Sequence, residues 1–241
     1  MPDALFSDPT LAPLYDGLDG PRDDLEPYVA IAHALGATSV LDLGCGTGSL
    51  ALLLADEGFD VIGVDPAAAS LEVARSKRGA ERVRWLFGDA TTLPPLQMDL
   101  ALMTGNVVQV FLTDFEWLET LRGLSGALRP NGHLVLESRR PEFRAWERWA
   151  EEQPDATLQV PDIGTVVRRF TLGSVALPLV SFRHDFIFPD GSHIVSDSTL
   201  RFRSRVEIEA NLTEAGFRTV EVRQAPDRPD REFVVIAQKM S

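Results

Sequence analysis

The sequence predicts an α/β fold with a doubly wound parallel sheet and an antiparallel β insertion. Short apolar runs alternate with helical periods between residues 39 and 103, a glycine-rich turn follows the first of these runs, and residues 158–203 alternate with period two. Alternating strands and helices are typical of βαβ units, whose parallel sheet is covered by helices on both faces. With 241 residues, 44% of them hydrophobic, the chain is expected to form one domain over residues 1–241.

The N-terminal segment, residues 1–36, is expected to cap the first strand. It contains scattered proline and glycine, and then a helical pattern that runs through Tyr28 and Ile31 and stops at Gly36. The pattern that follows predicts six elements in order: a strand over 39–43, a helix over 49–56, a strand over 60–64, a helix over 67–76, and strands over 83–87 and 98–103.

A capping box marks the start of the next helix. Thr113 supplies the hydroxyl and Glu116 the carboxylate three residues later, so a helix is expected over about 114–128. The Pro-Asn-Gly sequence at 130–132 is typical of a turn that ends this helix. A further strand is therefore expected over 134–136.

Residues 158–203 break the alternation and are expected to form antiparallel strands. Their period-two runs are interrupted by a Pro-Asp-Gly-Ser turn at 189–192. This insertion is expected to cover a substrate or to contact a second copy of the chain, since exposed antiparallel edges pair readily. A second capping box, Ser204 with Glu207, predicts a helix that closes at Gly216, followed by strands over 219–222 and 233–237.

The most informative stretch is residues 40–50, where an apolar strand runs into glycines at 44, 46 and 48 and then into a helix. Such a turn lets a ligand lie against the main chain, and the helix directs its free N–H groups toward that ligand. Three further motifs follow at residues 61–65, 87–90 and 128–134. Over roughly residues 38 to 140, these motifs together resemble the class I S-adenosylmethionine-dependent methyltransferases, in particular those acting on small molecules.

The resemblance implies a seven-stranded sheet whose last strand is antiparallel, with the insertion placed after strand five, and S-adenosylmethionine as cofactor. It implies that Asp42 orients the glycine turn and the methionyl ammonium, and an acid inside an apolar strand does need such a partner. Asp65 ends the second strand, where it is expected to accept hydrogen bonds from both ribose hydroxyls. The alternative for Asp65 is a cap on the helix that follows, and the two roles are compatible.

By the same resemblance, Asp89 is expected to hold the adenine amino group with the Ala90 N–H facing the ring; the alternative is a turn-forming aspartate. The backbone near Thr104 and Asn106 is expected to meet the methionyl end. Cys45 is interpreted as a small buried residue rather than a nucleophile. The expected cofactor-binding residues are Asp42, Gly44, Cys45, Gly46, Asp65, Pro66, Asp89, Ala90, Thr104 and Asn106, and no metal ligands are expected.

Two features bear on the acceptor. Asn106 begins Asn-Val-Val-Gln rather than the Asn-Pro-Pro-aromatic sequence of methyltransferases that act on nucleobase amines or glutamine amides. The formal charge of −13 and the pI of about 4.7 disfavour a phosphate-backbone partner. A small-molecule acceptor is therefore expected, and nucleic acid is not.

His184 is the candidate catalytic residue, as a general base. Alternation places it with Phe182 and Phe186 on one face of a strand in the insertion. A hydroxyl or ammonium acceptor must lose a proton, and histidine is the usual base near neutral pH. The alternative is a histidine packed in the core of the insertion.

Two further groups have open alternatives. Tyr15, Asp19 and Arg22 either fold over the cofactor or lie in an ordinary solvated loop. Trp146 and Trp149 either line an acceptor pocket or belong to the hydrophobic core.

The expected function is transfer of a methyl group from S-adenosylmethionine to an oxygen or nitrogen of a small molecule by in-line displacement. One alternative is an NAD-dependent oxidoreductase, although the third glycine comes one position early for its GxGxxG turn. The other is a protein that binds the cofactor without transferring methyl groups. The chain has a single cysteine and no apolar N-terminal run, which predicts a cytoplasmic protein without a membrane partner. A homodimer is the further partner expected.

Overall fold

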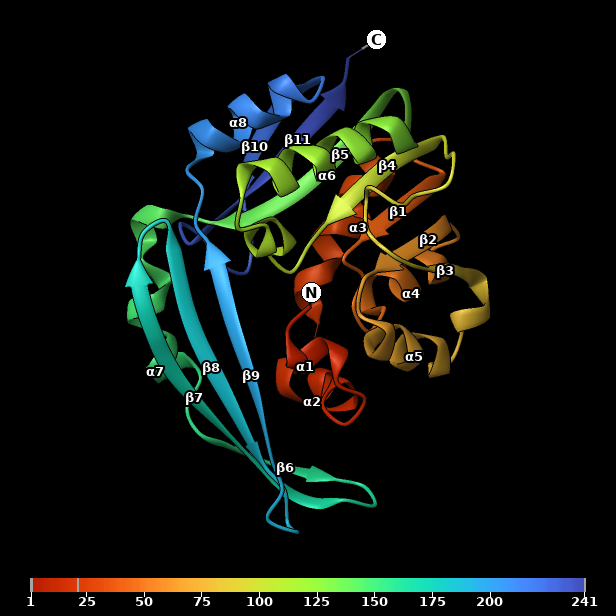
Figure 1. Ribbon diagram of the computed structural model, residues 1–241. Helices are drawn as coiled ribbons and strands as arrows, with labels where there is room; N and C mark the ends of the chain where they lie inside the picture. The colour runs from red at the N-terminus through yellow and green to blue at the C-terminus, as the bar shows by residue number, and fades with distance from the viewer. Residues whose placement is uncertain (1, 21, 241) are drawn as a thin grey trace.

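The computed structural model describes residues 2–20 and 22–240 (Figure 1). Within these residues, seven strands form a central sheet in the order β10-β11-β5-β4-β1-β2-β3, and four strands form a second sheet in the order β6-β7-β8-β9. The strands of the central sheet are β1 (Ser39–Leu43), β2 (Asp60–Asp65), β3 (Val83–Phe87), β4 (Met98–Met103), β5 (Leu128–Arg139), β10 (Phe217–Gln224) and β11 (Glu232–Lys239).

The last strand runs against the other six, as expected. Strands β1 to β5 pair in parallel, whereas β11 lies antiparallel between β5 and β10. The polar segment between β10 and β11 therefore forms a hairpin connection. Parallel strands end at the same edge of a sheet, so the residues that follow β1, β2 and β4 converge on one crevice.

Strand β5 is longer than the expected strand over 134–136. It begins directly after the preceding helix at Leu128, and Asn131 takes a left-handed conformation (φ +63°) inside it. The pairing with β4 shifts register between Met98 and Leu100 at this irregularity. The Pro-Asn-Gly sequence therefore distorts the strand rather than separating it from the helix, and β5 continues to Arg139, where it still pairs with β11.

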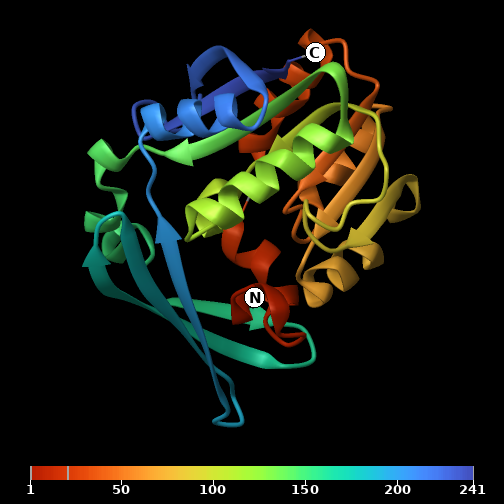
Figure 2. The same cartoon turned by 45° about the horizontal axis from the view of Figure 1, so that its top comes forward.

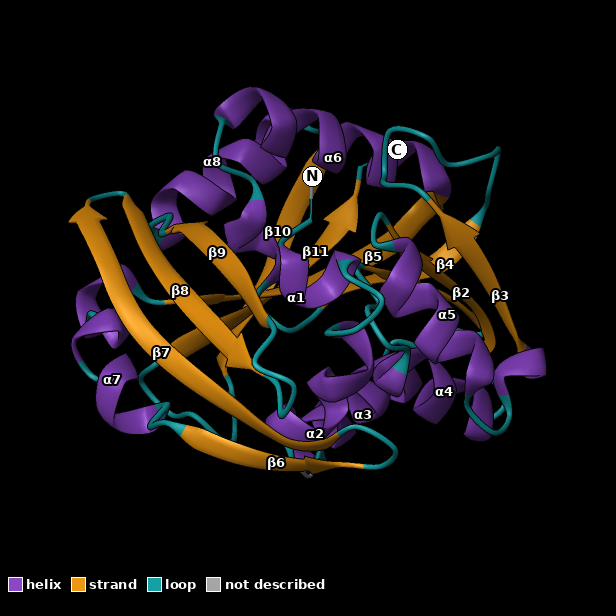
Figure 3. Cartoon of the chain, turned by 60° about the horizontal axis from the view of Figure 1, so that its bottom comes forward, coloured by secondary structure: helices purple, strands orange, loops and turns teal. Residues whose placement is uncertain are grey.

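Helices cover both faces of the central sheet. Figure 3 shows α6 (Asp114–Ala127) and α8 (Arg205–Glu214) on one side, and α3 (Glu26–Ala34) and α4 (Ser49–Asp56) on the other. Two separate buried clusters correspond to these faces. Both expected capping boxes are formed, at Thr113 and at Ser204. None of the helices in the described ranges is both long and apolar enough to cross a membrane.

The second sheet follows β5 and is antiparallel throughout. Its strands are β6 (Ala156–Val160), β7 (Gly164–Ala176), β8 (Leu179–Ile187) and β9 (His193–Arg201), and the short helix α7 (Trp149–Glu152) precedes them. The sheet thus occupies Ala156–Arg201, close to the expected 158–203. One face packs against aromatic residues near α7 at one end and against the N-terminal helices at the other.

The N-terminal strap, residues 3–19, lies between the two sheets (Figures 1 and 2). It contains α1 (Ala4–Ser7) and α2 (Tyr15–Asp19). Leu5 N donates to Ser196 Oγ in β9 at 2.9 Å, and Phe6 O accepts from Ser70 Oγ in α5 (Ala68–Ser76) at 2.9 Å. The strap therefore bridges the second sheet to the helix that follows β2, above the crevice.

Arg203 joins the second sheet to the segment after β4. This side chain is only 1% exposed and donates to the carbonyls of Val108, Phe111 and Thr113 at 3.3, 2.9 and 3.2 Å. Its guanidinium also lies 5.5 Å from the centre of the Trp117 ring. The insertion thus holds the loop that borders the crevice.

The Arg203→Met variant is expected to lose about 3 kcal/mol of unfolding free energy, because three carbonyls lose the donor that the buried guanidinium supplies. Urea unfolding measures this loss. Arg205→Met is the matched control, since Arg205 is exposed and its pair with Glu209 contributes little. Equal stabilities of the two variants would contradict the anchoring role of Arg203.

Candidate functional site

At two positions of the glycine turn after β1, the backbone conformation and the space allow only glycine. Gly44 and Gly48 have φ values of +76° and +83°. A Cβ on Gly44 would lie 2.6 Å from Val107 Cγ2, and one on Gly48 would lie 2.5 Å from Trp85 Cη2. The N–H groups of Gly44 and Cys45 both donate to Val64 O, at 2.8 and 3.1 Å. The turn is therefore tightly bound to the end of β2.

Asp65 lies directly beside this turn. The residue is 8% exposed, and its Oδ2 accepts from Gly46 N at 2.8 Å while its Oδ1 accepts from Ala67 N at 2.7 Å. Burial raises the pKa of Asp65, and these two amides act to lower it. Each oxygen has a second lone pair, so the carboxylate can hold the turn and still accept hydrogen bonds from a ligand. Pro66, which follows it, is exposed.

Asp42 is a buried carboxyl with an unused acceptor. It is 1% exposed, and its Oδ2 has no hydrogen-bond partner among the described residues. Burial raises its pKa to about 7, Asp65 adds to the shift, and Arg22 and the Ala51 amide oppose it. The Oδ2 atom of this carboxyl thus lacks the donor that normally accompanies a buried charge. The glycine turn therefore fits a ligand that brings an ammonium or another N–H donor to Asp42.

Cys45 and Ala90 are buried at 8% and 3% exposure. Burial raises the pKa of the Cys45 thiol well above its ordinary value, which suits a packing residue and not a nucleophile. Asp89 is exposed, and its Oδ1 accepts from Thr91 N at 2.9 Å and from Thr91 Oγ1 at 2.6 Å. The structure thus shows the turn-forming role of Asp89, and the adenine contact stays a prediction.

A network of buried charges beside Asn106 was not expected from the sequence. Asn106 N donates to Glu137 Oε1 at 3.1 Å, and its Nδ2 donates to Glu232 Oε1 at 3.2 Å. Glu137 also accepts from the Tyr28 hydroxyl in α3. In the sequence, Glu137 directly follows the apolar residues 134–136, where a carboxylate looks like the end of a strand, so nothing local pointed to this network.

The N-terminal strap closes over the glycine turn. Thr47 Oγ1 donates to Asp16 Oδ1 at 2.5 Å, and Lys77 Nζ lies 2.5 Å from Asp16 Oδ2. Arg22 donates from Nε to Asp24 at 2.9 Å, and it is near enough to Asp42 to lower the pKa of that carboxyl. The Tyr15 ring packs against Phe6, with centroids 5.3 Å apart. The side chain of Asp19 lies outside the described part of the chain.

His184 lies on the buried face of the second sheet, 6% exposed. Its Nε2 is 3.1 Å from Gln153 Oε1, and the rings of Phe170 and Phe182 have centroids 5.5 Å from its own. Burial and the charge of Arg168 lower its pKa to about 4, against the opposing effect of Asp185. A base of this strength is largely neutral at pH 7 and weak as a proton acceptor. The catalytic role of His184 therefore stays a prediction.

The His184→Gln variant tests both aspects of this residue. Because the folded pKa lies below the ordinary 6.5, the wild-type protein is expected to lose stability as the pH falls from 6.5 toward about 4, on the order of 3 kcal/mol. The variant should lack this part of the pH dependence in urea unfolding, whereas His33→Gln, at an exposed site, should retain it. An unchanged pH dependence in His184→Gln would contradict the buried neutral imidazole, and its turnover would test the catalytic role.

Trp146 and Trp149 are buried at 2% and 5% exposure. Their rings contact Phe202 and Phe182, with centroid distances of 4.7 and 5.2 Å. Both tryptophans therefore belong to the hydrophobic core that joins the insertion to the segment after β5.

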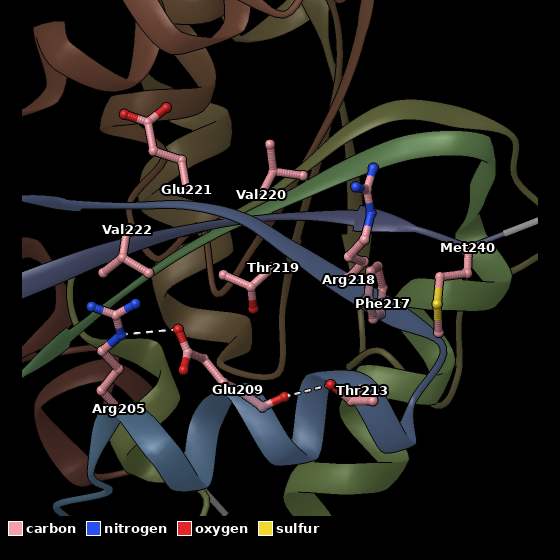
Figure 4. A pocket seen from close by; sticks show the side chains of 10 residues that line it. All are labelled: Arg205, Glu209, Thr213, Phe217, Arg218, Thr219, Val220, Glu221, Val222 and Met240. Atoms are coloured by element: carbon pink, nitrogen blue, oxygen red, sulfur yellow. Dashed lines mark hydrogen bonds and ion pairs between the residues drawn. The ribbon is translucent and has the colours of Figure 1, made fainter.

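A groove elsewhere on the surface is not part of this site. It lies between α8 and the edge strand β10 (Figure 4) and is lined by residues that include Arg205, Glu209, Thr219 and Met240. Strands β11, β5 and β4 separate it from β1. The groove is thus remote from the glycine turn.

Comparison with known proteins places the glycine turn within a methyltransferase domain. Residues 40–132 match the family described as Methyltransferase domain. A Cypemycin N-terminal methyltransferase from a Streptomyces species is 32% identical over 149 residues, which cover 60% of this chain and 61% of that protein. The chain therefore spans about three fifths of the length of this curated relative.

Two solved structures share the fold over nearly the whole chain. The CcbJ methyltransferase from Streptomyces caelestis has a TM-score of 0.77 at 22% identity, covering 98% of this chain and 97% of that one. The sugar N-methyltransferase KedS8 from Streptoalloteichus sp ATCC 53650 has a TM-score of 0.77 at 18% identity, covering 95% and 92%. Residues 40–132 are thus a methyltransferase domain, and the chain has the fold of the S-adenosylmethionine-dependent methyltransferases.

Proposed function

We propose that the protein transfers a methyl group from S-adenosylmethionine to a nitrogen or oxygen atom of a small molecule. The unpaired Oδ2 of the buried Asp42 supports this proposal most directly, since the cofactor carries an ammonium group of the kind that this oxygen needs. Asp65 would hold the ribose, Asp89 and Ala90 the adenine, and the segment from Thr104 to Asn106 the methionyl end. When bound, the cofactor supplies an electrophilic methyl group.

The acceptor would reach the crevice from the side of the second sheet and the N-terminal strap. The strap contacts the glycine turn through Asp16 and Thr47, and it contacts the second sheet through Leu5 and Ser196. The names of two similar proteins, a sugar N-methyltransferase and a Cypemycin N-terminal methyltransferase, support a small acceptor without identifying it. Alignment of the two reactants inside such a closed site supplies much of the rate in methyl transfer.

Binding of S-adenosylhomocysteine tests the cofactor part of the proposal. At a ligand concentration of about 100 times Kd, the folded state should gain about 2.7 kcal/mol, seen as a rise in Tm. NADH is the control ligand, because an oxidoreductase would show the reverse preference. Binding of NADH without binding of S-adenosylhomocysteine would contradict the proposal.

Turnover tests the acceptor part. Labelled S-adenosylmethionine would be offered with a panel of amino sugars, short peptides with free N-termini, and phenols, with bulk RNA as the macromolecular comparison. Label transfer to a small acceptor supports the proposal. Transfer to RNA above a heat-killed control would contradict it, and binding without transfer to any acceptor would favour a cofactor-binding protein.

A further inference from the structure

Two buried carboxylates hold the loop after β4. The function proposed above assigns no role to either of them. Glu137 in β5 accepts from Asn106 N, and Glu232 in β11 accepts from Asn106 Nδ2, at 3.1 and 3.2 Å. Glu137 is 1% exposed and Glu232 is 2% exposed. Burying a carboxylate this deeply costs free energy unless it is paired, so the role of each carboxylate depends on its partners.

The partners of the two carboxylates come from distant parts of the chain. The Tyr28 hydroxyl donates to Glu137, while Arg228 Nη1 and Arg139 Nε lie 3.0 and 3.6 Å from Glu232 Oε1. Two carboxylates thus meet two guanidiniums. Burial and Glu232 raise the pKa of Glu137, and Tyr28, Arg228 and the Asn106 amide act to lower it.

Asn106 links this network to the glycine turn. It has a left-handed backbone with φ +60°, a conformation that costs energy unless its surroundings hold it. The next residue, Val107, packs so closely on the turn that a Cβ on Gly44 would be 2.6 Å from its Cγ2. Any change in the conformation of Asn106 would therefore move the wall of the cofactor crevice.

The network lies at the crevice, and this location distinguishes it from buried pairs that only stabilise the fold. Glu137 lies near the carboxyl end of β5, and β5 pairs in parallel with β4, whose own carboxyl end leads into Asn106. Asp99 is the contrasting case, because it lies at the amino end of β4 and bonds Thr38 and Ser39, away from the crevice.

We propose that Glu137 is a positioning residue for the cofactor, which holds the Asn106 N–H and thereby sets residues 104–107 against the glycine turn. The inference rests on the proposed function, since the ligand that it affects is S-adenosylmethionine. Glu137 itself does not touch the ligand. Tyr28 donates to the other oxygen of this carboxylate, Oε2, and so couples α3 to the crevice.

Glu137→Ala, Glu137→Gln and the control Ser138→Ala test this inference by titration calorimetry with S-adenosylhomocysteine. Ser138 is 0% exposed on the same strand, but its side chain points to the other face of the sheet. Glu137→Ala is expected to weaken binding about tenfold or more, because the Asn106 N–H loses its acceptor. Glu137→Gln keeps an acceptor oxygen and should bind within about threefold of wild type, and Ser138→Ala should match wild type.

Wild-type affinity in folded Glu137→Ala would overturn the inference, and so would a Glu137→Gln variant as weak as Glu137→Ala. Should Glu137→Ala not fold, Tyr28→Phe removes the hydroxyl that holds Glu137 but keeps the ring. We expect about a threefold or greater loss of affinity for Tyr28→Phe, and unchanged affinity would overturn the inference. Failure of the wild-type protein to bind S-adenosylhomocysteine would instead contradict the proposed function.

Discussion

The Asp42→Asn variant is expected to be more stable than the wild-type protein at alkaline pH and to bind S-adenosylhomocysteine more weakly. Burial, with a contribution from Asp65, raises the pKa of Asp42 from 3.8 to about 7. A raised folded-state pKa means that the contribution of this group to stability is present below pH 3.8 and is lost as the pH rises through about 7. Asparagine carries no charge, so the variant should gain on the order of 2 to 4 kcal/mol near pH 8 and nothing near pH 4.

The cofactor affinity of the same variant should change in the opposite direction. A charge-assisted hydrogen bond to the ligand's ammonium would be lost, which predicts a weakening of about 1.5 to 3 kcal/mol. Urea unfolding at the two pH values and titration calorimetry provide both measurements. An unchanged Kd would show that the ligand ammonium does not meet Asp42.

Asp99→Asn is the matched control for stability. Asp99 is also buried, at 7% exposure, but Thr38, Ser39 and Arg129 all pair with it. Burial alone would raise the pKa of Asp99, yet the hydrogen bonds from Thr38 and Ser39 and the charge of Arg129 outweigh it and lower the pKa. Its substitution should therefore destabilise the protein at neutral pH. A stability loss in Asp42→Asn as well would contradict the buried-charge account of Asp42.

Replacing Asp65 by alanine is expected to weaken S-adenosylhomocysteine binding by about 1.5 to 3 kcal/mol, because a carboxylate that makes charge-assisted hydrogen bonds is lost. The substitution also removes the acceptors of Gly46 N and Ala67 N, which should lower stability by about 1 to 2 kcal/mol. Calorimetry and urea unfolding separate the two effects.

Asp60→Ala provides the control, because Asp60 is exposed at the other end of the same strand. It should leave the dissociation constant unchanged. Asp65→Ala with wild-type affinity would place the ribose contact elsewhere and leave Asp65 with its observed role at the glycine turn.

Several elements were predictable because their signals are local. The bounds of β1, α4, β3 and β4 agree with expectation to the residue, and both capping boxes are formed. Apolar runs of strand length, helical periodicity and capping hydroxyls are all set by neighbours in the chain. The alternation within β8 likewise predicted that His184 shares one face with Phe182 and Phe186, and on this face His184 and Phe186 are buried and Phe182 is partly buried.

Only part of the site could be predicted from residues that are neighbours in the sequence. The glycine turn could be recognised because its backbone requires glycine at particular positions. The network around Glu137 could not, because Tyr28, Glu137 and Glu232 are separated by about a hundred residues from one to the next. Polar residues at the end of β5 look like the end of a strand until their partners are known.

By itself, the sequence determined the α/β fold, the glycine turn after β1 and the acidic residues that end or interrupt its strands. Tertiary structure decided which of these acids are paired: Asp99 and Glu137 have donors from other elements, whereas one oxygen of Asp42 has none among the described residues. It also placed the N-terminal strap over the turn and His184 among aromatic rings. The physical reason is that burial and pairing, which set the cost of a charge, depend on contacts between residues far apart in the chain.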